Sequence, residues 1–359
     1  MVDKIHVLVI NPGSTSIKLG FYLSTGQKEI NEVKYDAPTL ELLGKRDISG
    51  YRRKLEEIVR DYLEEQEARW GEITAIAARG GLLKPVRGGV ILINQEMITD
   101  LLASRFGWHP SNMAPVVASD IARERRIEAY IVDPISTDEL AEVARISGFP
   151  DVPRRSFSHA LNMKMVGREV AVSELHKDYD SANLIVVHMG GRLSVSVHQC
   201  GKMVDVNDGR SEGPFGIEGS GGLPVYELLK YMERNNLTPG EMIRRLHNGS
   251  GLYGYLGSKN FQEIEANYDK DKRTTLAIDA LAYQIAKEVG GASAVLKGKV
   301  DGIIITGGLA HSQLLVNKIK ERICWIAPVF VRPGEREMDA LGIGVLEALK
   351  GQRAIHNYV

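Results

Sequence analysis

The stretch that decides the fold is VLVINPGSTSIKLGF, which spans residues 7–21. Its first four residues form a continuous apolar run, which is typical of a strand buried on both faces. Small and polar residues at 11–16 then interrupt the strand. Residues 17–21 alternate between apolar side chains and polar or small ones, which predicts a second strand and therefore a hairpin.

A similar pattern returns in LIVVHMGGRLSVSV, residues 184–197. An apolar run at 184–187 leads into a glycine-containing turn, and alternating residues resume at 193. Two similar openings, one in each half of the chain, predict duplicated α/β domains, although ordinary strand statistics can also produce such a match.

Apolar periodicity predicts further elements on both sides of the second hairpin. Strands are expected at 73–78, 129–132, 302–306 and 329–331, and helices at 51–68, 274–297 and 335–349. Several strands end directly in a polar residue or a glycine: Asn11, Arg79, Asp133, Gly190 and Gly307. Ligands of α/β sheets bind at the carboxyl ends of strands, so these residues are candidates for a site.

The composition argues against several classes of partner. The 359 residues include 45 Lys and Arg against 46 Asp and Glu, and this balance gives no reason to expect nucleic acid or an anionic membrane. No apolar run approaches the length of about 18 residues that a membrane-spanning helix needs. The first residues lack the apolar core of a signal peptide, and two cysteines, Cys200 and Cys324, make no disulfide framework. We therefore expect a cytoplasmic protein whose cysteines are buried as small apolar side chains.

The turns after the strands have a composition that suits phosphate. Gly, Ser and Thr offer unhindered backbone N–H groups and hydroxyls to phosphate oxygens. The sequence contains no Walker A motif GxxxxGK[ST] and no GxGxxG that opens a βαβ unit. A nucleotide site would therefore use the two hairpin turns. The alternative is that both are ordinary tight turns without a ligand.

Seven blocks of sequence follow one another in a recognisable order: VLVINPGSTSIK (7–18), ARGGLLKPVRGG (78–89), SNMAPVVASDIA (111–122), IVDPISTDE (131–139), RRSFSHALNMK (154–164), ITGGLAHS (305–312) and RPGEREMDALGIG (332–344). Together they resemble the butyrate kinases of the acetate kinase family, within the actin-like ATPase superfamily. The resemblance covers nearly the whole chain, and the combination is stronger than any single block.

This resemblance implies an α/β fold of two duplicated actin-like, or ribonuclease H-like, domains with a nucleotide cleft between them. The N-terminal domain is expected over residues 1–155, completed by the C-terminal helix 341–359. The C-terminal, nucleotide-binding domain is expected over 156–340. The family forms dimers and larger assemblies, so the resemblance also implies a homodimer or a larger homo-oligomer.

The resemblance also implies the residues of an ATP and Mg²⁺ site. Arg79 matches the arginine that steadies the carboxylate and phosphoryl oxygens, Asp133 the catalytic aspartate near the metal, and His159 the histidine that hydrogen-bonds the transferring phosphoryl group. Asp133 and Glu337 match the metal-associated carboxylates, although Glu335 leaves the register of the second open. The nucleotide is expected against Asn11, Ser14, Ser16, Gly190, Gly191, Gly307 and Gly308.

Each of these residues also has a simpler interpretation. Asp133 before Pro134 is typical of a turn, and His159 of a helix end. Arg79 fits a surface arginine, and Glu337 a solvated helix glutamate.

The implied activity is that of a butyrate kinase, the reversible, ATP-dependent phosphorylation of a short-chain carboxylate to its acyl phosphate. Gly80 and Gly81 follow Arg79 where acetate kinases typically carry two valines, which predicts room for butyrate or a branched acid of about four to five carbons. The alternative is that the glycine pair serves only the backbone turn. A second interpretation is another carboxylate kinase, acting on acetate or propionate. A third is a nucleotide-binding homologue without phosphotransfer, because Gly219 stands where butyrate kinases usually have an arginine. Arg192 and Arg210 are candidates to replace that charge.

Overall fold

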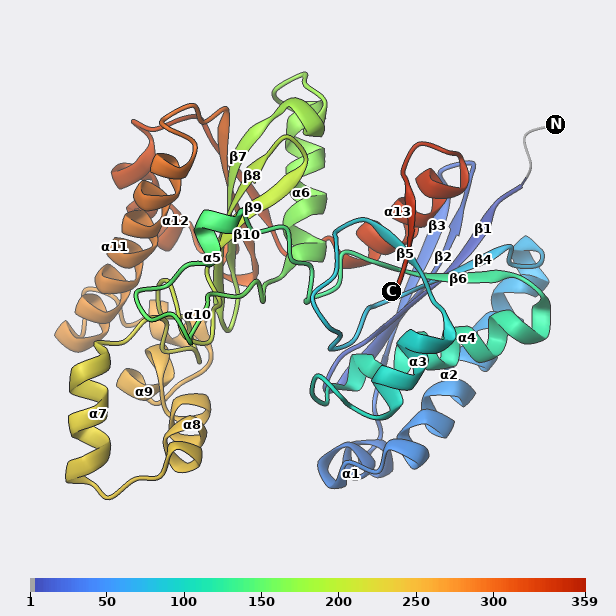
Figure 1. Ribbon diagram of the computed structural model, residues 1–359, viewed down its shortest axis with the longest axis horizontal. Coiled ribbons are helices and arrows are strands. Elements are labelled where there is room, and N and C mark those ends of the chain that lie inside the picture. The colour runs from blue at the N-terminus through green and yellow to red at the C-terminus, as the bar shows by residue number, and fades with distance from the viewer. Residues whose placement is uncertain (1–3) are drawn as a thin grey trace. The chain divides into compact units, whose positions relative to one another are not determined.

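The computed structural model describes residues 4–359, which divide into two compact units. The first unit contains the residues up to 137 together with 336–359, and the second contains 138–335. Each unit has its own β-sheet and its own hydrophobic core (Figure 1). The expected α/β fold with two domains is therefore confirmed. The boundary between the two domains that the sequence predicts, between residues 155 and 156, lies later in the chain than the observed one.

The first unit is built around a seven-stranded sheet with the strand order β12-β5-β6-β4-β1-β2-β3. Its strands are β1 (His6–Pro12), β2 (Ser16–Leu23), β3 (Lys28–Lys34), β4 (Ala75–Ala78), β5 (Val90–Leu92), β6 (Glu128–Val132) and β12 (Ile355–Asn357). Its helices are α1 (Ala37–Lys45), α2 (Ile48–Trp70), α3 (Gln95–Leu102), the 3-10 turn η1 (Pro110–Asn112), α4 (Met113–Arg125) and α13 (Glu337–Leu349).

The strand order of the first unit brings three strand ends together. β1 pairs antiparallel with β2, as the predicted hairpin requires, and parallel with β4, which in turn is parallel to β6. Parallel strands end at the same edge of a sheet. Asn11, Arg79 and Asp133, which end or follow these strands, therefore lie along one edge.

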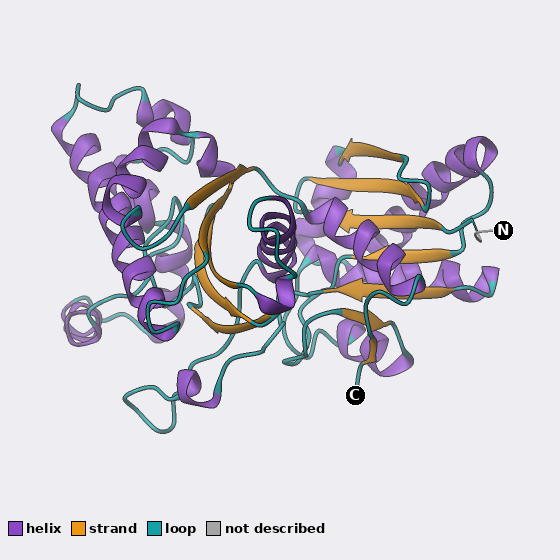
Figure 2. Ribbon diagram, turned by 90° about the horizontal axis from the view of Figure 1, so that it is seen from above, coloured by secondary structure: helices purple, strands orange, loops and turns teal. Residues whose placement is uncertain are grey.

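Helices cover both faces of this sheet (Figure 2). Leu8 of β1 belongs to the apolar cluster that α2 and α4 complete. On β2, Tyr22 packs against α13, where a Cβ at Gly342 would lie 2.5 Å from the tyrosine ring. Leu341 and Val345 of α13 are fully buried, as the sequence pattern of the closing helix predicts. Burial on both faces explains why β1 is apolar at consecutive positions.

The second unit contains a five-stranded sheet with the order β11-β10-β7-β8-β9. Its strands are β7 (Asn183–Met189), β8 (Leu193–Gln199), β9 (Lys202–Val206), β10 (Gly302–Gly307) and β11 (Val329–Pro333). Its helices are α5 (Glu142–Arg145), α6 (Ala160–Ser173), η2 (Tyr179–Ser181), α7 (Val225–Arg234), α8 (Pro239–Asn248), α9 (Gly251–Leu256), α10 (Phe261–Glu265), α11 (Lys272–Val295), η3 (Gly308–His311) and α12 (Gln313–Ile323).

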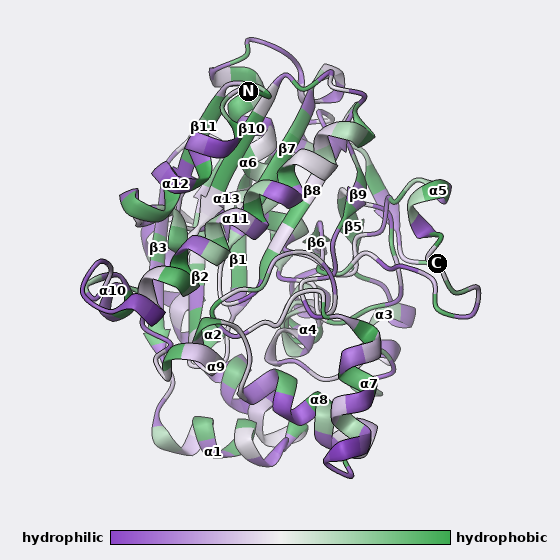
Figure 3. Ribbon diagram, turned by 90° about the vertical axis from the view of Figure 1, so that its left-hand side faces the viewer, coloured by the Kyte–Doolittle hydropathy of each residue, from purple (hydrophilic) through white to green (hydrophobic). Residues whose placement is uncertain are grey.

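β7 repeats in the second unit the role of β1 in the first. It pairs antiparallel with β8 and parallel with β10, which is parallel to β11. Leu184 and Val186 pack against α6, whereas Ile185 and Val187 pack against α11 on the other face. β7 and β10 are accordingly green along most of their length in Figure 3. The turns that follow these two parallel strands share one sheet edge.

Further observations concern the cysteines, the predicted helix 274–297 and the length of the helices. Cys200 and Cys324 are exposed, so the prediction that they are buried is wrong, because they lie in the β8–β9 turn and at the end of α12. α11 covers the predicted helix 274–297 except for its last two residues, and one face of α11 is open to solvent, with Leu276 71% exposed. Within residues 4–359, no helix has both the length and the apolar character to cross a membrane.

Candidate active site

Three polar side chains from distant parts of the sequence meet at the carboxyl edge of the first sheet. Asn11 lies near the end of β1, Arg79 directly follows β4, and Glu337 is the first residue of α13. Glu337 Oε2 accepts hydrogen bonds from Asn11 Nδ2 at 3.0 Å and from Arg79 Nη1 at 2.9 Å. Arg79 Nη1 also donates to Asn11 Oδ1 at 3.2 Å. Glu337 is thus the glutamate that joins the predicted residues Asn11 and Arg79.

Arg79 retains donors that the protein does not use. Its side chain is 28% exposed, and both of its hydrogen bonds involve Nη1. Within residues 4–359, its Nε and Nη2 atoms have no hydrogen-bond partner. A guanidinium is always charged, and its planar fork of donors matches a carboxylate or a phosphoryl group. Arg79 can therefore bind an anion while Asn11 and Glu337 hold it in place.

His109, which was not predicted as a site residue, lies near enough to this cluster for Arg79 and Glu337 to affect its pKa. The Ser111 backbone N–H donates to His109 Nδ1 at 3.2 Å, which leaves the ring proton on Nε2. Burial, and secondarily the positive charge of Arg79, lower the pKa of His109 to about 4, while Glu337 acts in the opposite direction. The ring is therefore a neutral hydrogen-bond donor at pH 7. A lone histidine before Pro110 carries no sequence pattern that marks such a role.

Asp133 directly follows β6 and has a backbone conformation that is uncommon outside glycine. Its φ is 36°, and its side chain is buried. The carboxylate Oδ1 accepts from the Gly89 N–H at 2.7 Å, and the Asp133 N–H donates to the Gly89 carbonyl at 3.0 Å. Residues held in such conformations cluster at functional sites, because the surrounding structure must fix them. Asp133 thus fixes the segment at Gly89, and its conformation keeps it a candidate for a functional carboxylate.

The donor set at this edge fits a magnesium ion that is shared with a substrate. Within residues 4–359, no group of three or more His, Cys, Asp and Glu side chains is placed to hold a metal ion. Mg²⁺ usually binds one or two carboxylates and completes its shell with water and substrate phosphates. Asp133 and Glu337 are two buried carboxylates on one sheet edge, which is the number that such a site requires.

The two serines of the first hairpin turn, Ser14 and Ser16, differ in their exposure and in their partners. Ser14 is exposed at the tip of the turn. Ser16 Oγ instead donates to Glu32 Oε1 of the neighbouring strand β3 at 2.6 Å. Ser14 is therefore accessible to a ligand, whereas the hydroxyl of Ser16 is engaged by the sheet.

Two glycine turns meet at the carboxyl edge of the second sheet. Gly190 and Gly191 connect β7 to β8, and Gly307 and Gly308 follow β10. Gly307 has a φ of 90°, and a Cβ there would lie 2.5 Å from the Met189 carbonyl oxygen, so only glycine fits. Gly308 has no heavy atom within 4 Å of its Cβ position. The structure thus brings the four predicted glycines to one edge.

His159 also reaches this edge, from the N-terminus of α6. Its ring stacks on that of His188, the penultimate residue of β7, with the centroids 4.0 Å apart and the planes 12° from parallel. His159 Nδ1 forms a hydrogen bond with Ser194 Oγ of β8 at 3.1 Å. His159 is therefore a helix-end residue, as the simpler interpretation holds, and it also belongs to a polar cluster at the glycine turns.

A buried amide fixes the tautomer of His188. Asn162 Nδ2 lies 2.9 Å from His188 Nδ1 and 3.3 Å from Thr306 Oγ1. An amide nitrogen donates, so His188 accepts at Nδ1 and carries its proton on Nε2. A Cβ at Gly190 would lie 3.2 Å from His188 Nε2, so this N–H faces the glycine turn. Sequence analysis missed both residues, although His188 directly precedes the Met189-Gly190 turn.

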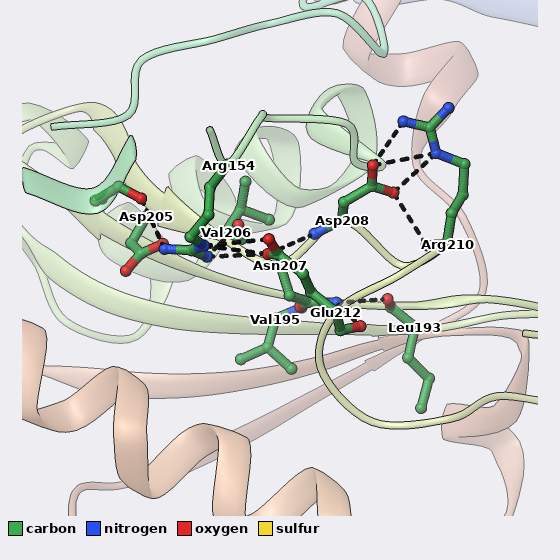
Figure 4. Close-up of polar contacts among 10 residues, drawn as sticks. Arg154, Leu193, Val195, Asp205, Val206, Asn207, Asp208, Arg210 and Glu212 are labelled. Carbon is green, nitrogen blue, oxygen red and sulfur yellow. Dashed lines mark hydrogen bonds and ion pairs between the residues drawn. The ribbon is translucent and has the colours of Figure 1, made fainter. Parts of the chain in front are cut away.

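Polar contacts hold the glycine-rich segment 206–224 in place. Asn207 Oδ1 accepts from the Val195 N–H at 2.5 Å, which ties the segment to β8. Arg154 Nε donates to Glu212 Oε1 at 3.2 Å (Figure 4). These contacts hold the segment against its neighbours, and its glycines let backbone atoms approach closely.

Gly80 and Gly81 are also close-packed. A Cβ at Gly80 would lie 2.5 Å from Pro134 Cβ, and one at Gly81 would lie 2.6 Å from Asn112 Cα. Neighbouring atoms already fill the volume that the two missing side chains leave. The hypothesis that these glycines open room for a longer acyl chain is therefore not supported.

The protein was compared with known families and structures. The model of the acetokinase family matches residues 152–324. An acetate kinase from Porphyromonas gingivalis superposes with a TM-score of 0.72 at 21% sequence identity, covering 95% of this chain and 99% of that one. A propionate kinase from Francisella tularensis gives 0.70 at 18% identity, covering 94% and 98% of the two chains. An acetate kinase from Entamoeba histolytica gives 0.71 at 15% identity, covering 97% and 98%.

The chain has the two-domain, actin-like fold of these kinases. The agreement extends over nearly the full length of each compared chain, so it includes both units. The fold predicted from the sequence resemblance is confirmed. At these identities the structural comparison establishes the fold alone.

The free energy of unfolding is expected to fall as the pH is lowered below about 6.5. Complete burial, and secondarily the charges of Lys164 and Arg168, lower the pKa of His198 to about 3. The unfolded chain binds this proton near pH 6.5, whereas the folded protein does not until about pH 3. The contribution of the neutral His198 ring to the free energy of unfolding is thus complete above pH 6.5 and decreases as the pH falls. At about 1.4 kcal/mol per pKa unit, the free energy of unfolding should be lower by about 2 kcal/mol at pH 5 because of His198.

Urea denaturation at pH 7.5 and pH 5.0 measures this effect. We expect His198→Gln to reduce the loss of stability between the two pH values, because glutamine does not titrate. His247→Gln is the matched control, since His247 is exposed on α8. Equal losses in the wild type and in His198→Gln would contradict the assignment.

Proposed function

We propose that this protein is a carboxylate kinase of the acetate kinase family, which converts ATP and a short-chain carboxylate to ADP and an acyl phosphate. The observation that carries the proposal is Arg79, a guanidinium held by Asn11 and Glu337 with its remaining donors available to an anion. The acetokinase match over residues 152–324 supports the same family for the nucleotide-binding unit.

The reaction needs positioning and charge stabilisation more than acid–base chemistry. A carboxylate is ionised at pH 7, so it attacks without a general base. One of its oxygens forms a bond to the γ-phosphorus while the bond from that phosphorus to the bridging oxygen breaks, and ADP leaves with the electron pair. The protein must bring two anions together and stabilise charge on the phosphoryl oxygens.

The residues of the first unit suit the acceptor side of this reaction. Arg79 would bind and orient the carboxylate, and His109 would donate from a neutral ring without adding a charge that competes with the substrate. Asp133 and Glu337 would hold Mg²⁺. When bound, the metal ion neutralises phosphate charge and polarises the phosphoryl oxygens.

The residues of the second unit suit the nucleotide side. The turns at Gly190-Gly191 and Gly307-Gly308 would bind ATP through backbone N–H groups. The resemblance also assigns Asn11, Ser14 and Ser16 to the nucleotide, and Ser16 would have to contribute its backbone N–H, because its hydroxyl donates to Glu32. His159 would hydrogen-bond the transferring phosphoryl group. Its ring is oriented by the stack on His188 and by Ser194.

We propose butyrate or a branched acid of about four to five carbons as the preferred substrate, on the strength of the resemblance to butyrate kinases. Because atoms fill the space next to Gly80 and Gly81, other residues must set the chain length. Acetate or propionate as the substrate is the second candidate, since the compared structures carry those activities in their names.

Gly81→Val is expected to destabilise the fold by about 1–3 kcal/mol without shifting the preferred acid towards acetate. The new Cβ would meet the backbone of Asn112 at 2.6 Å, and backbone atoms cannot move aside cheaply. Thermal unfolding and acyl-chain profiles of the variant measure the two effects. Gly148→Val is the control, because a Cβ there meets no heavy atom within 4 Å. A normally stable Gly81→Val that prefers acetate would restore the pocket hypothesis.

Trapping acyl phosphates as hydroxamates with hydroxylamine tests the proposed function. The purified protein, Mg²⁺ and ATP are incubated with straight and branched acids from acetate to hexanoate. Turnover with any of these acids supports a carboxylate kinase, and a maximum at butyrate or isobutyrate supports the preferred substrate. A folded protein that binds ATP but forms no acyl phosphate contradicts the proposal. It would favour the alternative of a nucleotide-binding homologue without phosphotransfer.

We also propose that the protein forms a homodimer or a larger homo-oligomer in the cytoplasm, as the family resemblance implies. Light scattering coupled to size-exclusion chromatography measures the assembly directly. A mass of 39.6 kDa in solution would identify a monomer and contradict this proposal.

A further inference from the structure

Arg192 occupies the turn between β7 and β8, in the middle of the glycine-rich edge of the second sheet. The Gly190 N–H donates to the Arg192 carbonyl at 3.3 Å, which closes the turn. The Glu218 N–H donates to the Gly191 carbonyl at 2.9 Å, which ties the turn to the segment 216–219. The position of the Arg192 backbone is therefore fixed from two sides.

Gly219 makes room for the Arg192 side chain. A Cβ at Gly219 would lie 3.1 Å from Arg192 Cγ, which is tighter than an ordinary contact. Gly209 and Gly216 instead allow a close approach of backbones, because a Cβ there would lie 2.5 Å from the Leu193 carbonyl oxygen and 2.6 Å from the Gly191 carbonyl oxygen. The glycines thus let the segment pack against the turn that carries Arg192.

Residue Arg192 is partly buried, and its side chain has no partner in the part of the chain that the structure describes, residues 4–359. The carboxylate on the neighbouring segment, Glu218, forms an ion pair with Lys259 instead. Arg210, the other arginine of this region, is occupied: Asp208 binds it through both oxygens, with Arg210 Nη2 2.6 Å from Asp208 Oδ2 (Figure 4). Its guanidinium also lies 3.8 Å from the Phe157 ring centroid.

We propose that Arg192 is a further catalytic residue, whose guanidinium binds the phosphate oxygens of the nucleoside triphosphate and stabilises charge on the phosphoryl group during transfer. Because no protein group within residues 4–359 occupies the Arg192 guanidinium, all of its donors are available to an anionic ligand. Arg192 also lies on the turn that offers its backbone N–H groups to phosphate. It forms no covalent bond in the reaction. This inference rests on the proposed function.

The proposal assigns a reason to Gly219. A Cβ there would lie 3.1 Å from Arg192 Cγ, so a side chain at 219 would crowd the side chain of Arg192. The absence of an arginine at 219 is therefore compatible with phosphotransfer. Among the two candidates from the sequence, Arg192 is available and Arg210 is not.

Arg192→Gln is expected to lower kcat for acyl phosphate formation by about 10²–10³-fold, because it removes a charged donor from the transition state. Its thermal unfolding should match that of the wild type, since Arg192 has no partner within residues 4–359. Arg155→Gln is the matched control, because Arg155 is exposed. Activity of Arg192→Gln within threefold of the wild type would overturn the proposal.

A relocation variant separates a role of the charge from a role of the turn. We expect Arg192→Gly alone to be as impaired as Arg192→Gln. Arg192→Gly combined with Gly219→Arg should form acyl phosphate at least tenfold faster than Arg192→Gly alone. The arginine introduced at 219 would then use the space that Arg192 has left. No recovery, with both variants folded by circular dichroism, would count against a charge shared by these positions.

Direct nucleotide binding distinguishes failure of this inference from failure of the proposed function. If the wild type forms no acyl phosphate, the carboxylate kinase assignment fails, and calorimetric titration with Mg²⁺ and ATP still tests Arg192. We expect Arg192→Gln to weaken the binding of ATP more than that of adenosine. Equal affinities of the wild type and Arg192→Gln for ATP would overturn the inference even then.

Discussion

Replacing Arg79 by glutamine is expected to lower the rate of acyl phosphate formation by about 10³-fold or more, which is the scale of a charge-stabilising arginine in phosphoryl transfer. Glutamine retains hydrogen bonding to Asn11 or Glu337 but lacks the charge and the free donors of the fork. Arg79→Lys should also be impaired, because one ammonium group cannot hold two protein acceptors and a carboxylate in the same plane.

A second measurement tests the Arg79 cluster without relying on activity. The positive charge of Arg79 helps to lower the pKa of His109, so that pKa should rise in Arg79→Gln. Titration of the His109 ring by NMR follows this change. Arg53→Gln on α2 is the matched control, because Arg53 is exposed. An unchanged His109 pKa in Arg79→Gln, or full activity of that variant, would contradict the geometry described above.

Replacing Lys164 by methionine is expected to destabilise the second unit by about 3–5 kcal/mol, because it leaves a buried carboxylate without its ionic partner. Lys164 is 2% exposed, and its Nζ lies 2.8 Å from Glu139 Oε2. The same oxygen accepts from the Met203 N–H at 2.8 Å. The pair thus connects α6 to β9 and to the chain that enters the second unit.

The double variant Lys164→Met with Glu139→Gln should recover much of that stability, since it removes both buried charges. Lys230→Met should change the free energy of unfolding by less than about 1 kcal/mol, because the Lys230–Glu227 pair is exposed. Urea denaturation of the four proteins measures these differences. A loss in Lys164→Met no larger than that in Lys230→Met would show that the buried pair contributes little.

Local sequence patterns predicted the strands whose ends carry the candidate site residues. The apolar runs at 7–10 and 184–187 are readable because both strands are buried on two faces, which requires apolar side chains at consecutive positions. The strand-end positions Asn11, Arg79 and Asp133 follow from the same patterns. The exposure of Cys200 was not predictable in this way, because it depends on a left-handed turn after β8 rather than on the apolar residues before it.

The sequence by itself determined the two hairpins, the ends of the parallel strands and the family resemblance, because each of these resides in residues that are neighbours along the chain. Tertiary structure alone decided that Glu337 meets Arg79, that His109 lies near them, that Pro134 and Asn112 fill the space at Gly80 and Gly81, and that Arg192 takes the space beside Gly219. These contacts join residues that are tens to hundreds of positions apart. The pairing of the strands and the packing of the helices bring them together, and no local pattern encodes those distances.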